Sequence, residues 1–328
     1  MKRRELISLL GGAAVAWPLA ARAQQPAMPV IGFLHIASSD GSADRLRAFR
    51  QGLKEAGFAE RENVAIEYSW AENQTDRLPE LAAELVRRKV AVIATTGGPA
   101  VALAAKTATT TIPIVFTTAG DPVAQGLVAN LNRPDANVTG VSFLVATLAA
   151  KQLGLLHELL PGAARIAVLV DPNNTLLTEA FIPDVRAAAS AIRKQIDVLY
   201  ASTGRDIDTV FESLAQKPVD ALLVGPGAFF FNRRVQLVTL ATRHAVPTIY
   251  GVREFVEAGG LMSYGTSLTD AYRQAGVHTG RILKGEKPAD LPVMQSIKFE
   301  FVINLNTARA FGLSFPPGLL AIADEVIE

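Results

Sequence analysis

The chain has 328 residues, of which 49% are hydrophobic and 19% are charged, a composition that is typical of a folded globular protein and excludes disorder. This length is sufficient for two domains of ordinary size. The sequence has no cysteine, which excludes a disulfide framework, thiol catalysis and a cysteine-ligated metal, and its formal net charge of +1 gives no electrostatic reason to expect nucleic acid as a partner.

The first 23 residues have the order of a secretory signal peptide. Lys2, Arg3 and Arg4 form a basic start, residues 6–19 are mostly apolar, and a small-x-small cleavage pattern ends at Ala23. The apolar run is too short and too interrupted by glycine to span a membrane. We therefore expect export with cleavage near Ala23 and no membrane-spanning segment, while the paired arginines leave both the general secretory and the twin-arginine routes open.

Cleavage at that point changes the charge of the protein. Removal of residues 1–23 takes away four basic residues and one acidic residue, so the formal charge falls from +1 to −2. No basic excess remains to attract nucleic acid or an anionic membrane. Because there is also no cysteine for a lipid anchor, we expect a free, monomeric periplasmic protein.

From residue 30 onward, short apolar runs alternate with longer amphipathic stretches. We expect strands at 30–36, 64–70, 90–94, 114–116, 138–143, 166–170, 198–201, 221–224, 248–250, 261–264 and 299–305. We expect helices at 43–57, 78–89, 99–107, 123–131, 148–160, 184–195, 207–216, 233–244, 255–258, 268–283, 307–311 and 319–327. This alternation indicates parallel sheets covered by helices on both faces.

Two consecutive series of about five strands each favour two sheets over one. The predicted fold is therefore α/β, with two doubly wound parallel-sheet lobes joined by a three-segment hinge. We assign residues 28–139 and about 264–285 to lobe one, and residues 142–260 and about 290–328 to lobe two. The chain is expected to cross between the lobes near 139–142, near 259–264 and near 285–292.

Ligands of doubly wound sheets bind at the carboxyl ends of the strands, so the residues that follow the predicted strands are the candidates for a ligand site. Most of them are small, hydroxylated or amide-bearing, and such groups hydrogen-bond a polar solute reversibly but supply little catalytic power. The candidates are Ser38, Ser39, Thr96, Gly97, Gly98, Thr117, Thr118 and Asp121 in lobe one, and Asn173, Asn174, Gly225, Gly227, Phe229 and Tyr250 in lobe two.

Several candidates have two interpretations. Gly97 and Gly98 precede a predicted helix and either cradle a carboxylate at its N-terminus or form an ordinary turn. Asp121 either pairs with a ligand ammonium group or caps the helix predicted at 123–131. His35 either contacts the ligand or belongs to the core, and the three aromatic residues at 229–231 either stack on a ligand or pack at the rim of the cleft.

Motifs for catalysis and for cofactors are missing from the sequence. No pair among the four histidines has the spacing of metal ligands, and neither a G-x-S-x-G elbow nor a G-x-x-x-x-G-K-[ST] phosphate loop occurs. The turn after the first predicted strand lacks the G-x-G-x-x-G fingerprint of dinucleotide sites. We therefore expect no enzyme, no cofactor and no metal.

The chain resembles the ABC-transporter substrate-binding family related to the tryptophan-binding protein TrpX, which has the type I periplasmic binding protein fold. The resemblance covers almost all of the chain after the signal segment, and its motifs are specific only in combination. They are PIVF at 113–116, DPV at 121–123, GLV at 126–128, NVTGV at 137–141, GGLMSYG at 259–265, RILKG at 281–285, LPV at 291–293 and INLNTA at 303–308.

The resemblance implies an ABC importer component that captures a small polar solute in the interlobe cleft by hinge closure and delivers it to an inner-membrane ABC permease. The solute would be an amino acid or a related carboxylate, with aromatic amino acids as one alternative. A ligand sensor that signals to a membrane receptor and an exported α/β enzyme are the competing interpretations. The site implied by the resemblance comprises Ser38, Thr96, Gly98, Thr117, Asp121, Asn173, Tyr250 and Tyr264.

Overall fold

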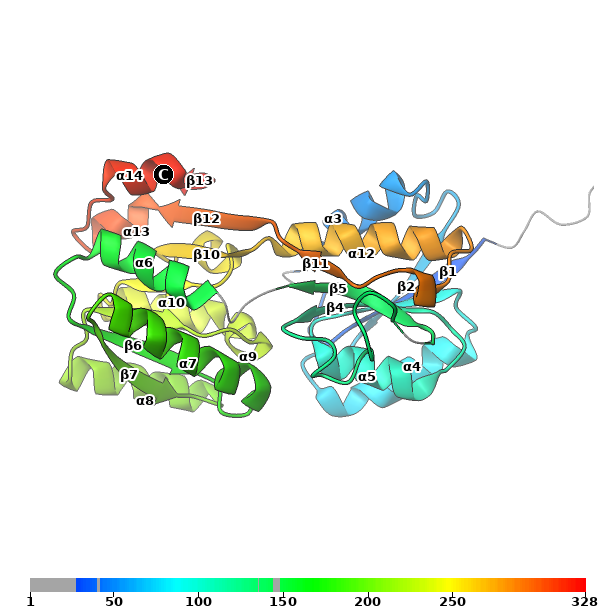
Figure 1. Ribbon diagram of the computed structural model, residues 1–328, viewed down its shortest axis with the longest axis horizontal. Helices are drawn as coiled ribbons and strands as arrows, with labels where there is room; N and C mark the ends of the chain where they lie inside the picture. Colours follow the sequence, from blue (N-terminus) through cyan, green and yellow to red (C-terminus); the bar gives the residue numbers. More distant parts are fainter. Residues whose placement is uncertain (1–27, 40–41, 135, 144–147) are drawn as a thin grey trace, which may run out of the picture.

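The protein folds into two α/β lobes that lie side by side along its longest axis (Figure 1). The computed structural model describes residues 28–39, 42–134, 136–143 and 148–328. The predicted signal segment at 1–23 lies outside the described residues. Each lobe has a central sheet covered by helices on both faces, so the two-lobed α/β fold predicted from the sequence is confirmed.

Lobe one is built on a sheet of six strands that are all parallel, in the order β11-β5-β4-β3-β1-β2. The strands are β1 (Val30–His35), β2 (Ala65–Trp70), β3 (Val92–Thr96), β4 (Ile114–Ala119), β5 (Val138–Phe143) and β11 (Met294–Ser296). The helices are α3 (Ala43–Glu55), η1 (Thr75–Arg77), α4 (Leu78–Arg87), α5 (Pro99–Ala108), α12 (Leu268–Leu283) and η3 (Pro288–Asp290).

Lobe two has seven strands in the order β13-β12-β10-β9-β8-β6-β7, and the pair β10 and β12 is antiparallel. The strands are β6 (Arg165–Val170), β7 (Gln195–Tyr200), β8 (Ala221–Val224), β9 (Thr248–Tyr250), β10 (Met262–Thr266), β12 (Phe299–Asn304) and β13 (Glu325–Ile327). The helices are α6 (Ala149–Leu159), α7 (Thr175–Ala191), α8 (Gly204–Gln216), α9 (Ala228–Asn232), α10 (Arg234–Arg243), α11 (Glu254–Glu257), α13 (Leu305–Ala310) and α14 (Pro317–Ile322).

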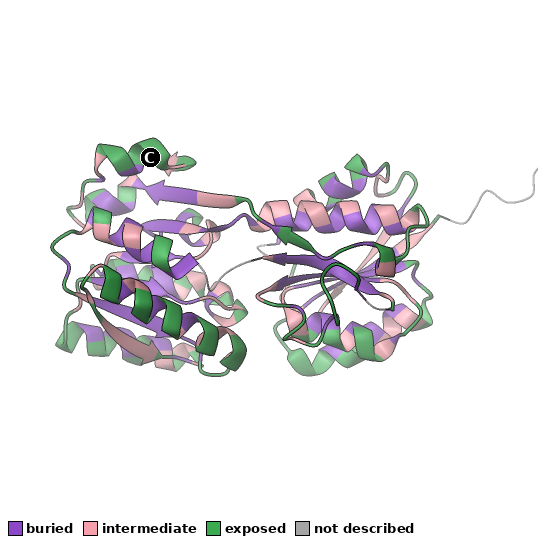
Figure 2. Cartoon of the chain, viewed as in Figure 1, coloured by how far each residue is buried: buried purple, intermediate pink, exposed green. Residues whose placement is uncertain are grey.

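Apolar residues on both faces of the strands explain this layering (Figure 2). In β1, Ile31 and Phe33 pack under α3 and α12, whereas the next residue, Leu34, packs under α4 and α5. Successive side chains of a strand point to opposite faces, so a strand that is apolar throughout requires a cover on each side. The same arrangement recurs in lobe two, where Val168 and Leu169 of β6 belong to the cores on opposite faces.

Two glycines bring α3 and α12 into close contact in lobe one. A Cβ atom on Gly52 would lie 1.8 Å from the Arg273 carbonyl oxygen, and one on Gly276 would lie 2.1 Å from the Phe49 carbonyl oxygen. Real atoms do not approach so closely, so the absence of a side chain at both positions lets the two helix backbones touch. This contact fixes α12, which follows a strand of lobe two, firmly onto lobe one.

The chain passes between the lobes at three places, and all three lie later in the sequence than predicted. The first follows β5 and falls on residues 144–147, outside the described residues. The second is at Ser267, between β10 in lobe two and α12 in lobe one, and the third is at Ile297 and Lys298, between β11 and β12. The prediction was wrong because β5 and β10 complete their own sheets before the chain leaves, and because β11 is an additional edge strand of lobe one.

The second and third crossings are joined to each other. The Ser267 amide donates a hydrogen bond to the Lys298 carbonyl oxygen at 2.9 Å, which continues the antiparallel pairing of β10 with β12 beyond Thr266 and Phe299. The two segments therefore cross as a short hydrogen-bonded ribbon, visible between the lobes above β5 (Figure 1).

The helix predicted at 123–131 does not form. Asp121 Oδ1 accepts a hydrogen bond from the Val123 amide at 2.8 Å, and the segment closes into turns that end at Gly126, whose φ is +73°. The predicted start of α7 at residue 184 is also wrong, since α7 begins at Thr175 and contains Pro183. The terminal helix predicted at 319–327 ends at Ile322, and the edge strand β13 follows it.

Candidate functional site

A cavity of about 420 Å³ lies between the two lobes, at the carboxyl ends of their central strands. Residues that follow β1, β3 and β4 line it from lobe one, and residues that follow β6, β8 and β9 line it from lobe two. A cavity of this volume is in the range that holds a small molecule. Because both lobes contribute walls, a molecule inside it contacts both of them at once.

The N-terminus of α5 forms one polar part of the lobe-one wall. β3 ends at Thr96, Gly97 and Gly98 adopt φ values of +97° and +120°, and α5 begins at Pro99 without a side-chain cap. Residues 97–101 all line the cavity. Uncapped amide groups in the first turn of a helix, together with the helix dipole, favour a negatively charged or carbonyl oxygen at this position.

The Thr117 hydroxyl is a second polar group on lobe one. Thr117 lies in β4, is 1% exposed and lines the cavity, and its Oγ1 atom has no hydrogen-bond partner among the described residues. A buried hydroxyl without a partner costs free energy. A ligand atom that bonded to it would recover that cost.

The lobe-one side of the site also contains an aromatic cluster, which lies beneath α3 and α12. His35 Nδ1 accepts a hydrogen bond from the Ala37 amide at 2.9 Å, which places the ring proton on Nε2, 3.4 Å from the Tyr272 hydroxyl. The His35 ring lies 5.4 Å from the Trp70 ring. Burial, together with the positive charge of Arg45, lowers the pKa of His35 to about 3, so its side chain is neutral at physiological pH.

The polar groups of lobe two come from the turn after β6 and from α6. Asp171, Asn173 and Asn174 follow β6 and line the cavity, and Asp171 is 8% exposed. Gln152 of α6 also lines it. Gln152 Nε2 donates a hydrogen bond to the Tyr264 carbonyl oxygen at 2.8 Å, while its Oε1 atom is buried with no partner in the described part of the chain.

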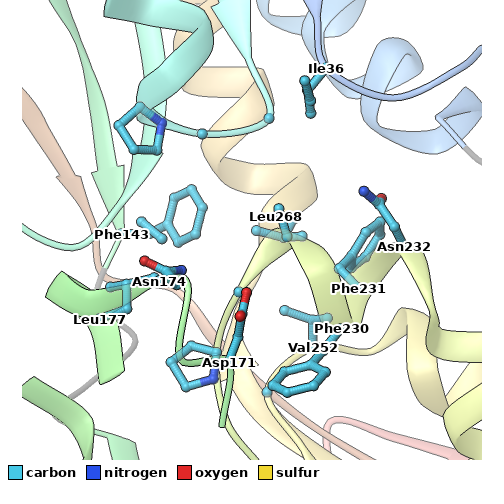
Figure 3. Close-up of a pocket in the computed structure, with 18 of the residues that line it drawn as sticks. Ile36, Phe143, Asp171, Asn174, Leu177, Phe230, Phe231, Asn232, Val252 and Leu268 are labelled. Carbon is cyan, nitrogen blue, oxygen red and sulfur yellow. The ribbon is translucent and has the colours of Figure 1, made fainter. Parts of the chain in front are cut away.

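Apolar side chains from both lobes form much of the remaining wall (Figure 3). Ile36 and Phe143 come from lobe one, Leu268 from the start of α12, and Phe230 and Val252 from lobe two. The site therefore combines polar groups near the strand ends with a broad apolar surface. Such a site is suited to a molecule that has one polar end and one apolar end.

Six of the predicted site residues line this cavity: Gly97, Gly98, Thr117, Asn173, Asn174 and Gly227. Of their strands, β6 and β8 end where the sequence predicted, whereas β3 and β4 continue beyond the predicted ends to Thr96 and Ala119. The parallel arrangement brings the ends of these strands to one edge of each sheet. Gly225, which the sequence also placed at a strand end, lines the cavity as well. Whether these residues bind a ligand stays a prediction.

The other lobe-one candidates lie outside the cavity lining. Ser38 and Ser39 turn back toward Ser42, whose Oγ and amide groups donate to their carbonyl oxygens. Thr96 is fully buried at the end of β3, and the Thr118 hydroxyl donates a hydrogen bond to Gln125 Oε1 at 2.8 Å.

Asp121 is a further correction in lobe one. Its side chain is exposed and outside the cavity lining, and its Oδ1 atom bonds to the Val123 amide. Of its two interpretations, the structure therefore supports the local cap, although that cap closes a turn instead of starting a helix.

Three aromatic candidates of lobe two also pack away from the cavity. Tyr250 is 1% exposed and stacks on Phe255, with 4.6 Å between the ring centres, inside the core under α10 and α11. Tyr264 stacks on Phe299 at 6.1 Å, and Phe229 packs on its neighbour Phe230 at 5.2 Å. Side chains alternate across a strand, so the positions of Tyr250 in β9 and Tyr264 in β10 do not by themselves show which face each ring occupies. Phe229 lies in α9, where the packing of the helix decides which side chains face the cavity.

Several lining residues were not selected from the sequence. Asp171 follows β6 directly and could have been found by the strand-end rule that selected Asn173. Arg45, Gln152 and Tyr272 lie within α3, α6 and α12, and no local pattern indicates which helix positions reach the cleft. Of the aromatic residues at 229–231, Phe230 and Phe231 line the cavity, whereas Phe229 does not.

The described residues contain neither a cluster of metal ligands nor a membrane-spanning helix. Nowhere in residues 28–39, 42–134, 136–143 and 148–328 do three or more His, Cys, Asp or Glu side chains gather as a metal site. Within the same ranges, no helix has both the length and the apolar character needed to cross a bilayer.

Relatives of this chain were found by both sequence and structure. A tyrosine-binding protein of Clostridioides difficile (strain R20291) is 26% identical over 267 residues, which cover 81% of this chain and 76% of the relative. A Streptococcus pneumoniae ABC domain in complex with L-Trp superposes with a TM-score of 0.82 at 24% identity, over 91% of this chain and 99% of that one. The ligand-free, open structure of a Clostridium difficile substrate-binding protein with adhesive properties gives a TM-score of 0.70 at 26% identity, with the same coverage.

The family is established by a match over nearly the whole described length. Residues 30–327 match the model of the family described as ABC transporter substrate binding protein. The match spans both lobes and every strand that lines the cavity. This chain therefore belongs to the ABC transporter substrate-binding protein family.

Proposed function

We propose that this protein is the periplasmic solute-binding component of an ABC importer and that it captures an amino acid in the interlobe cavity. The observation that carries the proposal is a single cavity whose walls come from the strand ends of both lobes. A ligand that contacts both walls favours the arrangement in which the lobes are close together. The inner-membrane permease would then recognise that arrangement.

The composition of the cavity supports an amino acid as the ligand. The uncapped N-terminus of α5 and the Thr117 hydroxyl suit a carboxylate, and the surface formed by Phe143, Phe230 and Val252 suits an apolar or aromatic side chain. The relatives that bind tyrosine and tryptophan support the same class of ligand.

Lobe closure is supported by the likeness to relatives in two states. The TM-score is 0.82 for the structure with bound L-Trp and 0.70 for the open ligand-free structure, although the open one is slightly more similar in sequence, at 26% against 24% identity. The chain as a whole is thus more similar to the ligand-bound relative, which supports a closed arrangement of the lobes.

A panel of the twenty amino acids, measured by thermal unfolding and isothermal titration calorimetry, tests the binding function. We expect one amino acid or a small group of them to raise the melting temperature, with roughly 2.7 kcal/mol of stabilisation at about 100 times Kd. X-ray scattering should show a smaller radius of gyration with that ligand than without it. A panel without any binder would contradict the proposal.

Further measurements separate the importer from its alternatives. Export predicts that protein isolated from cells starts close to Gln24 by intact mass, and a monomer is expected in light scattering. Uptake of the labelled ligand by cells should stop when the protein is deleted. Continued uptake with loss of a signalling response would instead support the sensor, and turnover of the bound ligand would support an exported enzyme.

A further inference from the structure

Asp171 places a buried carboxyl group in the wall of the cavity. It follows Val170, the last residue of β6, and is 8% exposed. Figure 3 shows the carboxyl group directed into the cavity, between Asn174 and Val252. Its local role is a turn, since Oδ1 accepts a hydrogen bond from the Asn173 amide at 2.9 Å.

This carboxyl group takes part in no ion pair within the described structure. No charged neighbour contributes to its titration. Burial raises its pKa, and the bond from the Asn173 amide offsets only part of that shift. Buried carboxylates are normally paired, because leaving one without a cation costs free energy.

A second acceptor lies on the same lobe of the same cavity. The bond from Gln152 Nε2 to the Tyr264 carbonyl oxygen fixes the orientation of the side-chain amide, because a carbonyl oxygen accepts only from the NH₂ end. Gln152 Oε1 is therefore the unpartnered atom, and it is buried. Lobe two thus offers a negative charge and a neutral acceptor, a combination that favours a ligand group rich in N–H donors.

We propose that Asp171 binds the ammonium group of the ligand and restricts the site to solutes that carry a cationic amino group. The inference rests on the proposed function and narrows it, because it separates amino acids from carboxylic acids of the same shape. It also assigns an orientation, with the ammonium group toward lobe two and the carboxylate toward α5 of lobe one.

The chain contains a matched control for this carboxylate. Asp121 also follows a strand, precedes a proline and accepts a bond from the amide two residues later, that of Val123, at 2.8 Å. Asp121 differs in being exposed and outside the cavity lining. D171N and D121N therefore each remove one negative charge from the same type of turn. The side-chain oxygen that accepts the hydrogen bond from the amide two residues later is retained in both variants.

The experiment measures the affinity of both variants and of the wild type for matched ligand pairs. Each pair contains an amino acid and the same acid without its amino group, such as L-phenylalanine with 3-phenylpropanoate, alongside the twenty-amino-acid panel. We expect wild type and D121N to bind the amino acid and to reject its partner. D171N should lose about 100-fold in affinity for the amino acid, and it should bind the amino-free acid at least as well as the wild type does.

The outcomes distinguish this inference from the proposed function. Equal affinity of wild type and D171N for an amino acid would overturn the role of Asp171 and leave the amino-acid receptor intact. Preference of the wild type for the amino-free acid would also overturn it. A wild type that binds no member of any pair contradicts the proposed function, and the role of Asp171 fails with it. Thermal unfolding of D171N without ligand verifies that the variant is folded.

Discussion

The guanidinium carbon of Arg45, on α3 of lobe one, lies 4.6 Å from the ring centre of Phe231, on α9 of lobe two. The same guanidinium lies 5.7 Å from the Tyr272 ring of its own lobe, so it is placed between the two lobes. A second contact crosses nearby, where Asn232 Nδ2 donates a hydrogen bond to Asn73 Oδ1 at 2.8 Å. These contacts join the lobes beside the cavity and require no ligand.

Replacement of Phe231 should weaken ligand binding without a change in the cavity's polar groups. F231L removes the ring that faces Arg45, and a cation–π contact of this kind contributes about 0.5–2 kcal/mol. If the contact exists only when the lobes are close, its loss favours the open form. We expect affinity to fall by about 2- to 30-fold, and the radius of gyration of the free protein to increase in X-ray scattering.

Arg234 provides the control for that variant. Its guanidinium carbon lies 5.0 Å from the same Phe231 ring, but it belongs to lobe two. R234M therefore removes a cation from the ring without removing a contact between the lobes, and affinity should stay within about twofold of the wild type. Equal losses of ligand affinity in F231L and R234M would show that the Phe231 ring affects binding only through its contacts within lobe two.

The Thr117 hydroxyl should affect binding and stability in opposite directions. T117V retains the shape of the side chain and removes an oxygen that has no partner among the described residues. The free energy of unfolding without ligand should therefore rise by about 1 kcal/mol, while the affinity for the amino acid falls. Urea unfolding and calorimetry measure the two effects.

Thr95 separates the two effects. Its Oγ1 atom is also buried without a partner in the described structure, but Thr95 does not line the cavity. T95V should stabilise the free protein as T117V does, with unchanged ligand affinity. A loss of affinity in T95V equal to that in T117V would indicate a general effect on lobe one.

His35 should make the protein less stable as the pH falls. Its pKa in the folded protein is about 3, below the ordinary value of 6.5, so between these values the unfolded chain binds a proton that the folded chain excludes. By linkage, the free energy of unfolding decreases as the pH falls from 6.5 toward 3, by up to about 1.4 kcal/mol per pH unit. Urea unfolding of wild type and H35Q at several pH values measures the difference, and parallel curves would contradict it.

The contact between α3 and α12 predicts a large effect of one methyl group. In G276A the new Cβ would meet the Phe49 carbonyl oxygen, so the two helices must separate, at a cost of at least about 2 kcal/mol in the free energy of unfolding. Gly154 in α6 has no atom within 4 Å of the corresponding position. G154A should instead stabilise the protein by about 0.5–1 kcal/mol, as measured by urea unfolding.

The sequence predicted most of the central strands because both of their faces are covered. Strands such as β6 and β8 are continuous apolar runs, and short apolar runs bounded by turn residues are readily identified. The edge strands β11 and β13 have three residues each and are partly exposed, so they lack that signal. The segment at 123–131 has helical spacing, but a turn that Asp121 closes replaces the helix.

The site could be predicted only in part for a related reason. Gly97 and Asn173 come after the ends of β3 and β6, Thr117 lies near the end of β4, and a parallel sheet brings such positions together. Arg45 and Gln152 reach the cavity from helices, and their direction depends on how each helix packs on its sheet. That packing is a property of the tertiary structure.

The hydrogen bond between Ser267 and Lys298 has a mechanical consequence for the two lobes. A pair of hydrogen-bonded strands flexes readily perpendicular to its plane and resists deformation within that plane. Sliding of one lobe past the other would stretch this bond. Rotation about an axis that lies in the plane of the two strands and runs across them would preserve it. In the lobe closure that we propose, the plane of these two strands would therefore set the axis about which the two halves of the molecule rotate.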